Sequence, residues 1–255
     1  MNLHFETNLA DSYKSQSQKI RVLSEAWVQR EIYCPNCGYI SINKYKNNNP
    51  ASDFYCSVCK ENYELKSQKK HNLKKIIDGS YSSMINLIEE SRNPNLFILK
   101  YDSFNLVVSD LVVIPRHFFT SSIIEKRKEL SQSARRKGWV GCNILVDKIP
   151  SEGKIPLVSD NIPITKEIVE SQWKKTLFLQ KENKESKSWI IEIMNCVNFL
   201  NKKTFSIDEI YVFEGHLKCI FPHNQHIKAK IRQKLQILRD THYLDFLGNG
   251  LYRLR

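Results

Sequence analysis

Two pairs of cysteines stand at the spacing of a metal-binding ribbon. Cys34 and Cys37 form one Cys-x-x-Cys pair, Cys56 and Cys59 form a second, and 18 residues separate the two pairs. Each pair can offer two thiolates from a tight turn, and two such turns complete a tetrahedron around Zn²⁺. Four thiolates leave no open coordination position, so the spacing predicts a structural rather than a catalytic zinc ion. A redox-active dithiol is the alternative, which the second matched pair disfavours.

Two carboxylates and an amine flank the second cysteine pair. Asp53 precedes it, and the stretch Glu64-Leu65-Lys66 follows it. Residues i and i+2 of a strand point to one face, so Glu64 and Lys66 can face the same phosphate. Asp53 and Glu64, with the carbonyl of Leu65, can bind a hard cation such as Mg²⁺, and Lys66 can orient a water molecule. Taken alone, the pattern also fits ordinary charges on exposed strands, because such triads arise by chance in many chains.

The charge balance of the chain favours a polyanionic partner. The 255 residues include 39 Lys and Arg against 27 Asp and Glu, which gives a formal net charge of +12. A hydrophobic fraction of 41% is enough for a sizeable buried core, so the composition excludes a disordered chain. A basic globular protein most simply binds nucleic acid, although many intracellular proteins are basic without a specific reason.

The cysteine count and the apolar runs indicate the expected compartment. Seven cysteines, an odd number, argue against a disulfide framework, and the three outside the paired motifs predict small buried side chains. The first residues lack the charged and apolar regions of a signal peptide. The longest apolar run, residues 106–114, is too short to cross a bilayer. We therefore expect a cytoplasmic protein with no membrane partner.

The elements that would position the candidate carboxylates predict an α/β or α+β domain that ends near residue 180. Apolar residues at positions 20, 23 and 27 predict a helix over 19–30, and a capping signal that opens at Asp78 predicts another over 78–91. Polar, Asn-rich residues predict a loop over 43–52. Strands are predicted over residues 95–101, 105–115, 143–150 and 153–158.

A change of pattern predicts a second domain. Residues 180–188 are charged and free of apolar side chains, which is typical of a linker. Beyond it the pattern predicts a helix over 189–200, a helix opened by the capping box Ser206-x-x-Glu209, a helix over 226–240, and a hairpin over 243–255 that turns at 248–250. Three helices and a terminal hairpin are the layout of a winged helix. We therefore assign residues 1–182 and 183–255 to separate domains.

Six stretches carry a resemblance to a known family. In chain order they are YCPNCG, SDFYC, YELKS, ARRKGWVGCN, WIIEIMNC and IRQKLQILRD, and they fall across nearly the whole chain. On these stretches the sequence resembles the PD-(D/E)xK nucleases and, among them, the DpnI-type restriction endonucleases, which cut adenine-methylated GATC. One position departs from the pattern, because Ser52 stands where the family's name has Pro. That position does no chemistry.

The resemblance implies a fold and a role for each candidate residue. It implies a PD-(D/E)xK nuclease core with an inserted zinc ribbon, followed by a winged-helix domain, both reading methylated DNA. Asp53, Glu64 and Lys66 would take the catalytic places with Mg²⁺ as cofactor, and the four paired cysteines would bind structural Zn²⁺. The expected partner is double-stranded, adenine-methylated DNA, which we expect the protein to bind as a monomer.

Two basic stretches are candidate DNA contacts. In the first, Arg135, Arg136 and Lys137 precede Trp139, so the cations could hold phosphates while the ring presses against bases or an adenine N6-methyl group. A buried Trp beside solvated cations is the alternative. In the second, a helix over 226–239, the candidate contacts are Lys228, Lys230, Arg232, Gln233 and Gln236. In a major groove Gln can pair with adenine and Arg with guanine, whereas a solvated basic face would contact phosphate alone.

Together these expectations describe a Mg²⁺-dependent type II restriction endonuclease that hydrolyses double-stranded DNA at GATC sites containing N6-methyladenine. The methylation preference follows from the resemblance and not from the chemistry of any residue. Two alternatives stay open. One is a zinc-ribbon and winged-helix DNA-binding regulator without catalysis, and the other is a nuclease that acts on unmodified DNA.

Overall fold

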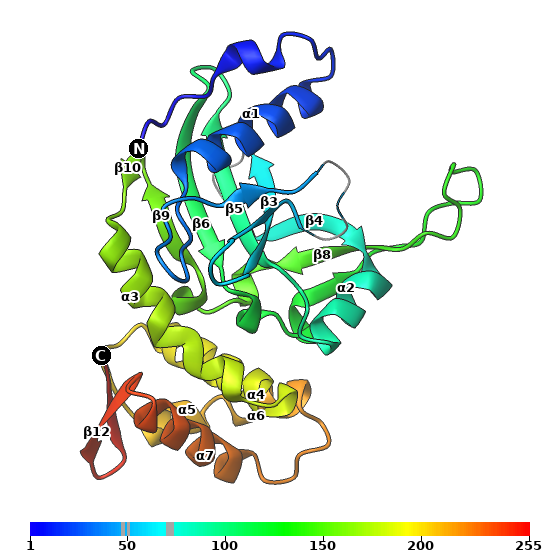
Figure 1. Ribbon diagram of the computed structural model, residues 1–255. Helices are drawn as coiled ribbons and strands as arrows, with labels where there is room; N and C mark the ends of the chain where they lie inside the picture. The colour runs from blue at the N-terminus through cyan, green and yellow to red at the C-terminus, as the bar shows by residue number, and fades with distance from the viewer. Residues whose placement is uncertain (47–48, 50–51, 70–73) are drawn as a thin grey trace. The chain divides into compact units, whose positions relative to one another are not determined.

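The chain folds into two compact units. The computed structural model describes residues 1–46, 49, 52–69 and 74–255 (Figure 1). The first unit contains Met1–Asp147 and Glu152–Thr176, and the second contains Lys148–Ser151 and Leu177–Arg255. Within the described residues, no helix is long and apolar enough to cross a membrane.

A seven-stranded sheet lies at the centre of the first unit (Figure 1). Its strands are β1 (Asn43–Lys44), β2 (Phe54–Tyr55), β3 (Asn62–Gln68), β5 (Asn95–Asp102), β6 (Val107–Ile114), β9 (Ile155–Ser159) and β10 (Ile162–Pro163), and they lie in the order β1-β2-β3-β5-β6-β9-β10. The pair β3 and β5 is parallel, and the other neighbours are antiparallel. The predicted strands over 95–101, 105–115 and 153–158 are thus confirmed, and their apolar runs explain their central place in the sheet.

The predicted loop over 43–52 begins two residues too early, because Asn43 and Lys44 pair with Tyr55 and Phe54 across β1 and β2. Residues 47, 48, 50 and 51 of that loop lie outside the described residues.

A smaller antiparallel sheet carries the other part of the first unit. Its strands are β4 (Lys75–Ser80), β8 (Gly141–Leu145) and β7 (Ile124–Lys126), in the order β4-β8-β7, and helix α2 (Tyr81–Glu89) follows β4. The predicted helix over 78–91 therefore begins later than expected, at Tyr81, with the Ser80 hydroxyl accepting from the backbone N–H of Ser83. Asp78 belongs to β4 instead, because its backbone pairs with β8. The predicted strand over 143–150 ends at Leu145, where a 3-10 turn takes over.

Two longer helices complete the first unit. Helix α1 (Gln16–Glu31) confirms the helix predicted over 19–30 and packs on β1 and β3 through a buried face that includes Leu23, Trp27 and Val28. Helix α3 (Lys166–Thr176) was not predicted, and it packs on β9 with Val169 and Trp173 fully buried.

Short 3-10 helices occur in both units and cover Thr7–Ala10, Arg116–Phe118, Ser121–Ile123, Val146–Lys148, Ser151–Gly153 and Leu177–Lys181.

The second unit is helical with a small sheet. Its elements are α4 (Lys184–Leu200), β11 (Thr204–Ser206), α5 (Ile207–Tyr211), α6 (Glu214–Ile220), α7 (Ile227–Asp240), β12 (Leu244–Gly248) and β13 (Leu251–Leu254), with the strands in the order β11-β13-β12. The predicted capping box at Ser206 and Glu209 and the hairpin turn at 248–250 are both present. These helices and the terminal hairpin confirm the predicted fold class.

Two boundaries in the second unit differ from the prediction. The linker expected over 180–188 is wrong, because a 3-10 helix covers Leu177–Lys181 and α4 already begins at Lys184, capped by the Asn183 side chain. The charged residues form an exposed first turn, while Ser186 and Trp189 already face the core. The helix expected to start at the capping box ends after five residues at Tyr211, and α6 is a separate helix.

Candidate functional site

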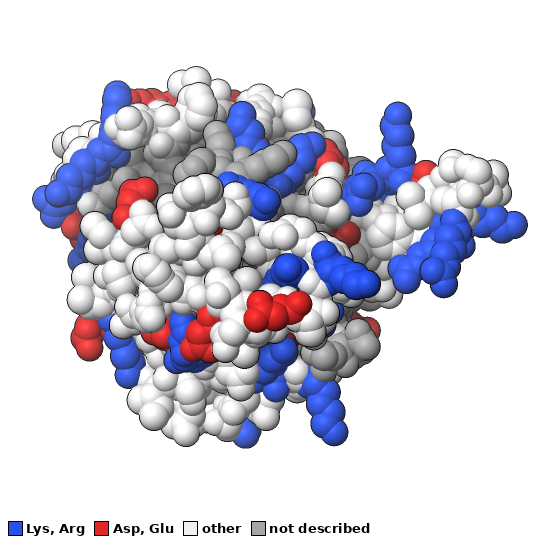
Figure 2. Space-filling view, turned by 90° about the horizontal axis from the view of Figure 1, so that it is seen from above, with Lys and Arg blue, Asp and Glu red and all other residues white. Residues whose placement is uncertain are grey.

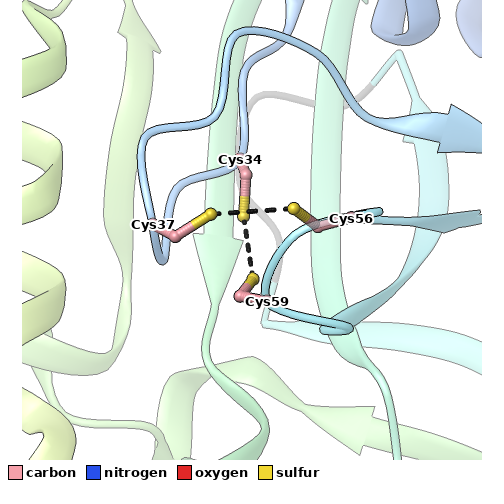
Figure 3. A group of neighbouring side chains, drawn as sticks. All are labelled: Cys34, Cys37, Cys56 and Cys59. Carbon is pink, nitrogen blue, oxygen red and sulfur yellow. Dashed lines mark hydrogen bonds between the residues drawn. The ribbon is translucent and has the colours of Figure 1, made fainter.

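The four paired cysteines meet at one point of the first unit (Figure 3). Their sulfur atoms all lie within 4.8 Å of one another. The Sγ atoms of Cys34 and Cys59 are 3.5 Å apart, and those of Cys37 and Cys56 are 3.6 Å apart. A zinc ion with bonds of ~2.3 Å to each sulfur would place tetrahedral neighbours about 3.8 Å apart. The cluster therefore fits the predicted structural zinc ion.

The two cysteine turns share one backbone design. The N–H of Gly38 donates to the carbonyl of Cys34 at 2.8 Å, and the N–H of Lys60 donates to the carbonyl of Cys56 at 3.1 Å. Gly38 and Lys60 both adopt a left-handed conformation, with φ of 70° and 62°. A Cβ at position 38 would lie 2.0 Å from the Glu170 carboxylate of α3, so this flexible side chain would have to move if another residue stood there.

Tyr63 links the cysteine cluster to strand β3. Its hydroxyl lies 3.1 Å from the Sγ of Cys34, and its ring is fully buried and stacks on Phe97 with centroids 4.8 Å apart. Burial, and then the neighbouring Cys34 sulfur, raise the pKa of Tyr63 well above its ordinary value, so the hydroxyl keeps its proton. With zinc bound, the Cys34 sulfur would be a thiolate, and the Tyr63 hydroxyl would then donate to it. Tyr63 directly precedes Glu64, so the sulfur cluster holds the strand that carries the candidate catalytic residues.

The strand arrangement brings Asp53 beside Glu64. The N–H of Asp53 donates to the carbonyl of Tyr63 at 2.9 Å, and the Asp53 Oδ2 atom accepts the N–H of Leu65 at 2.7 Å. Burial is the main cause that raises the pKa of Asp53 above its ordinary value. Asp53, Glu64 and Lys66 thus lie together, on the two chain segments that lead into and out of the Cys56–Cys59 turn.

Glu64 and Lys66 project from β3 on one face and form an ion pair. The Lys66 Nζ atom lies 2.6 Å from the Glu64 Oε1 atom, and only 24% and 17% of the Lys66 and Glu64 side chains are exposed. Burial raises the pKa of Glu64 to about 7, although the charge of Lys66 acts in the opposite direction. Burial alone would lower the pKa of Lys66, but the nearby carboxylates raise it above its ordinary value, so the amine stays charged.

A third carboxylate reaches the same amine, and no sequence motif had marked it as a site residue. The Asp78 Oδ1 atom of β4 lies 2.7 Å from the Lys66 Nζ atom, and the Asp78 side chain is 6% exposed. The Asp-Gly-Ser stretch is typical of a helix cap, so a helix was predicted at Asp78, whereas this residue belongs to strand β4. Its partner strand β8 begins more than 60 residues further along the chain, so no local pattern could have revealed it.

A cleft of about 980 Å³ opens beside this cluster, between α1, β3 and β4. Lys66 and Leu65 form part of its lining, and α1 contributes Arg21 and Glu25. The Glu25 carboxylate pairs with the Arg21 guanidinium at 3.2 Å and with the Lys44 amine at 2.7 Å. The lining of the cleft therefore contains one carboxylate, that of Glu25, and several cations that can face a polyanionic backbone: Arg21, Lys66, Lys69, Lys74 and Lys75. The sequence pattern predicted helix α1 but did not predict that Arg21 and Glu25 of this helix line a cleft.

The first basic stretch lies on a segment that projects between β7 and β8 (Figures 1 and 2). Figure 2 shows Lys and Arg side chains gathered on this projection, and Arg135 and Arg136 are both exposed. Trp139 is half-buried, and its ring covers the backbone of Gly141, where a Cβ atom would lie 2.8 Å from the ring. The N–H of Leu130 donates to the carbonyl of Trp139 at 3.0 Å, which closes the base of the segment.

The second basic stretch is helix α7. Lys228, Arg232, Gln233 and Gln236 are exposed on it, and Lys230 is half-buried. Lys228 and Arg232 both lie over the Tyr211 ring, 5.3 Å and 5.5 Å from its centroid. These cations stack on one side of the helix. Gln233 and Gln236 are exposed on the same helix, so their amides can meet a base edge.

A surface hollow of about 610 Å³ adjoins the first turn of α7, and Gln225, His226 and Gln233 belong to its lining. The sequence pattern did not identify this concavity, since it depends on how the segment before the helix turns back over it. Gln233 is therefore exposed on α7 beside this hollow.

Two family models match the chain in succession. The model described as "DpnI: Dam-replacing family" matches residues 1–182, and the model described as "Dam-replacing HTH domain" matches residues 185–254. The first match alone covers more than half of the 255 residues. The second agrees with the helical second unit and its exposed helix α7. The chain therefore belongs to the DpnI (Dam-replacing) family and carries that family's helix-turn-helix DNA-binding domain.

Proposed function

We propose that this protein is a Mg²⁺-dependent type II restriction endonuclease that hydrolyses double-stranded DNA at GATC sites containing N6-methyladenine. The observation that carries the proposal is the meeting of Asp53, Glu64 and Lys66 in one largely buried cluster beside a cleft. Family membership supports the same activity. A regulator that only binds DNA would gain nothing from charges withdrawn from solvent, because their desolvation costs stability.

The donor set suits a hard divalent cation. Asp53, Glu64 and the carbonyl of Leu65 offer oxygen atoms, the ligand type that Mg²⁺ prefers. Asp53, Glu64 and Asp78 bring three carboxylates near the single Lys66 amine, and a bound divalent cation would favour their charged forms. A bound Mg²⁺ ion would stabilise negative charge on the phosphate and lower the pKa of a coordinated water molecule.

The protein side chains would divide the remaining work. Lys66 is charged and lines the cleft, so it can donate to a phosphate oxygen or to the attacking water. The backbone N–H of Leu65 fixes the Asp53 carboxylate. Since that hydrogen bond uses one oxygen of Asp53, the other oxygen remains available to a cation. Asp53 directly precedes β2, and the antiparallel pairing of β2 with β3 sets the position of Asp53 relative to Glu64 and Lys66.

DNA recognition would involve both units. We propose that Arg135 and Arg136 hold phosphates while Trp139 packs against bases, and that α7 enters a major groove in the manner of a recognition helix. Gln233 and Gln236 are the exposed amides that could pair with adenine. The N6-methyl group of adenine projects into that groove, so the same helix face can sense methylation.

The substitution Asp53→Asn tests catalysis separately from binding. Asn retains an oxygen that can accept the Leu65 N–H but loses the charge. We expect the variant to bind a methylated GATC duplex like the wild type in Ca²⁺, and to cut it in Mg²⁺ about a hundredfold to a thousandfold more slowly.

Asp102→Asn is the matched control, because Asp102 also accepts a backbone N–H, that of Phe104 at 2.8 Å, but lies at the exposed end of β5. It should cut at the wild-type rate. If the protein is a regulator, the wild type itself will not cut DNA. If Asp53→Asn cuts as fast as the wild type, the role assigned to Asp53 is wrong.

A further inference from the structure

The amine of Lys66 is shared between two carboxylates on different sheets. Its Nζ atom lies 2.6 Å from Glu64 Oε1 on β3 and 2.7 Å from Asp78 Oδ1 on β4. Of the three side chains, Asp78 is the least exposed, at 6%. The more deeply buried partner of the amine is therefore Asp78, a residue that the catalytic pattern does not include.

The backbone around Asp78 is fixed by the smaller sheet. Asp78 pairs with Cys142 of β8, and the register shifts by one residue between Asp78 and Ser80. The Cys142 thiol donates to the carbonyl of the intervening Gly79 at 3.5 Å. Such bulges redirect a side chain relative to a regular strand. The sheet thus aims the Asp78 carboxylate at the Lys66 amine from a rigid support.

The contacts of Asp78 leave little room for a purely structural role. Its Oδ1 atom accepts from Lys66, and within the described residues its Oδ2 atom is buried without any hydrogen-bond partner. A buried carboxylate that served the fold would be expected to accept backbone N–H groups, because an unsatisfied buried charge costs stability. Asp78 instead directs its one strong interaction to the candidate catalytic amine.

Glu64 would have to interact with two groups, the Lys66 amine and the proposed cation, whereas Asp78 interacts with the amine alone. In the proposed function Glu64 binds a cation, and its oxygens are then less available to the Lys66 amine. We propose that Asp78 is a positioning residue that holds Lys66 at the reacting phosphate while Glu64 serves the cation. This inference rests on the proposed nuclease activity.

Two substitutions at Asp78 test this role in the full-length protein. Asp78→Asn retains the shape and an oxygen that can accept from the amine, whereas Asp78→Ala removes the contact. We expect Asp78→Ala to slow single-turnover cleavage of a methylated GATC duplex by about a hundredfold, and Asp78→Asn to slow it less. Duplex binding in Ca²⁺ and the Mg²⁺ concentration for half-maximal rate should stay within about twofold of wild type, since Asp78 acts on Lys66 rather than on DNA or metal.

A measurement on the Mg²⁺-saturated protein without DNA, in which Glu64 would serve the cation, reads the position of Lys66 directly. A hydrogen-bonded, immobile lysine amine gives its own ¹⁵N–¹H ammonium signal in NMR, which can be assigned by its loss in Lys66→Met. We expect this signal to persist in Asp78→Asn and to broaden or vanish in Asp78→Ala. Asp110→Asn is the control, because Asp110 also faces a lysine amine, that of Lys100 at 3.9 Å, but is more exposed, at 18%, and lies away from the cluster.

Three results would overturn the inference. They are wild-type cutting by both Asp78 variants, an unchanged Lys66 signal in Asp78→Ala, and a rise of tenfold or so in the Mg²⁺ requirement of Asp78→Asn, which would make Asp78 a metal ligand. If the wild type itself fails to cut methylated DNA, the proposed function fails, and the ammonium signal still decides whether Asp78 positions Lys66. Should Asp78→Ala fold poorly in thermal unfolding, the cutting rates of Asp78→Asn and Asp110→Asn decide the matter: slower cutting by Asp78→Asn supports the inference, and equal rates overturn it.

Discussion

Removing one hydroxyl, in Tyr63→Phe, should weaken zinc binding without disturbing the packing around it. Phe keeps the ring that is fully buried and stacked on Phe97 at 4.8 Å, so no cavity forms. What is lost is the hydrogen bond from the hydroxyl to Cys34 Sγ at 3.1 Å. With zinc bound, this sulfur is a thiolate, and it loses its only hydroxyl donor among the described residues.

The size of the effect follows from the charge of the acceptor. A hydrogen bond to a charged group contributes about 1.5–3 kcal/mol, and about 2 kcal/mol corresponds to a zinc affinity weaker by roughly thirtyfold. Because zinc binding stabilises the folded first unit, its unfolding midpoint should fall by about 4–8 °C. Tyr63 precedes Glu64, so we also expect slower cutting at limiting zinc and normal cutting at saturating zinc.

Zinc transfer to a chromophoric chelator, followed together with thermal unfolding, provides the assay. Tyr45→Phe is the matched control, since the Tyr45 hydroxyl donates to Asn62 Oδ1 at 2.9 Å on the same hairpin without touching sulfur. The control should release zinc like the wild type. If Tyr63→Phe and Tyr45→Phe release zinc at the same chelator concentration, then Tyr63 is an ordinary core residue and the proposed link between cluster and strand is wrong.

Three further predictions concern the metal, the DNA contacts and pH. Protein freed of zinc by chelation, as verified by metal assay, should lose both ribbon structure and cutting; full-rate cutting by zinc-free protein would contradict the structural role. Replacing Arg135, Arg136 and Lys137 together by Ala should reduce the slope of log affinity against log salt by up to about 2.7, measured by duplex binding at several salt concentrations. An unchanged slope would mean that these cations do not touch phosphate. Burial lowers the pKa of Lys234 below its ordinary value of 10.5. The unfolded state then binds more protons between the folded pKa and 10.5, so the free energy of unfolding should rise with pH across that window. Lys234→Met should lack this rise in parallel denaturant titrations, and identical pH profiles of the two proteins would refute the assignment.

Much of the geometry of the cysteine cluster and of the candidate triad could be predicted because its determinants are local. Two Cys-x-x-Cys turns form from their own backbone hydrogen bonds, and the spacing between them only has to allow the turns to meet. The two-residue period of a strand places Glu64 and Lys66 on one face whatever sheet the strand joins. The position of Asp53 could not be predicted from local pattern alone, because its place beside Glu64 depends on the antiparallel pairing of β2 with β3.

The residues that were missed depend on distant partners. Asp78 has the local signature of a helix cap, and pairing with β8 overrides that signature. Tyr63 is an ordinary strand residue by pattern, and only the folded ribbon brings the Cys34 sulfur to its hydroxyl. The start of α4 at Lys184 was hidden for a similar reason, since its charged first turn has the composition of a linker until Trp189 is buried.

Digestion of two otherwise identical plasmids, one from an adenine-methylating host and one from a non-methylating host, tests the central claim most directly. With Mg²⁺ present, the protein should cut the methylated plasmid into the fragments expected from its GATC sites and leave the other intact. The Asp53→Asn variant should cut the methylated plasmid about a hundredfold to a thousandfold more slowly. A methylated plasmid that survives, or cutting of both plasmids at equal rates, would contradict the account.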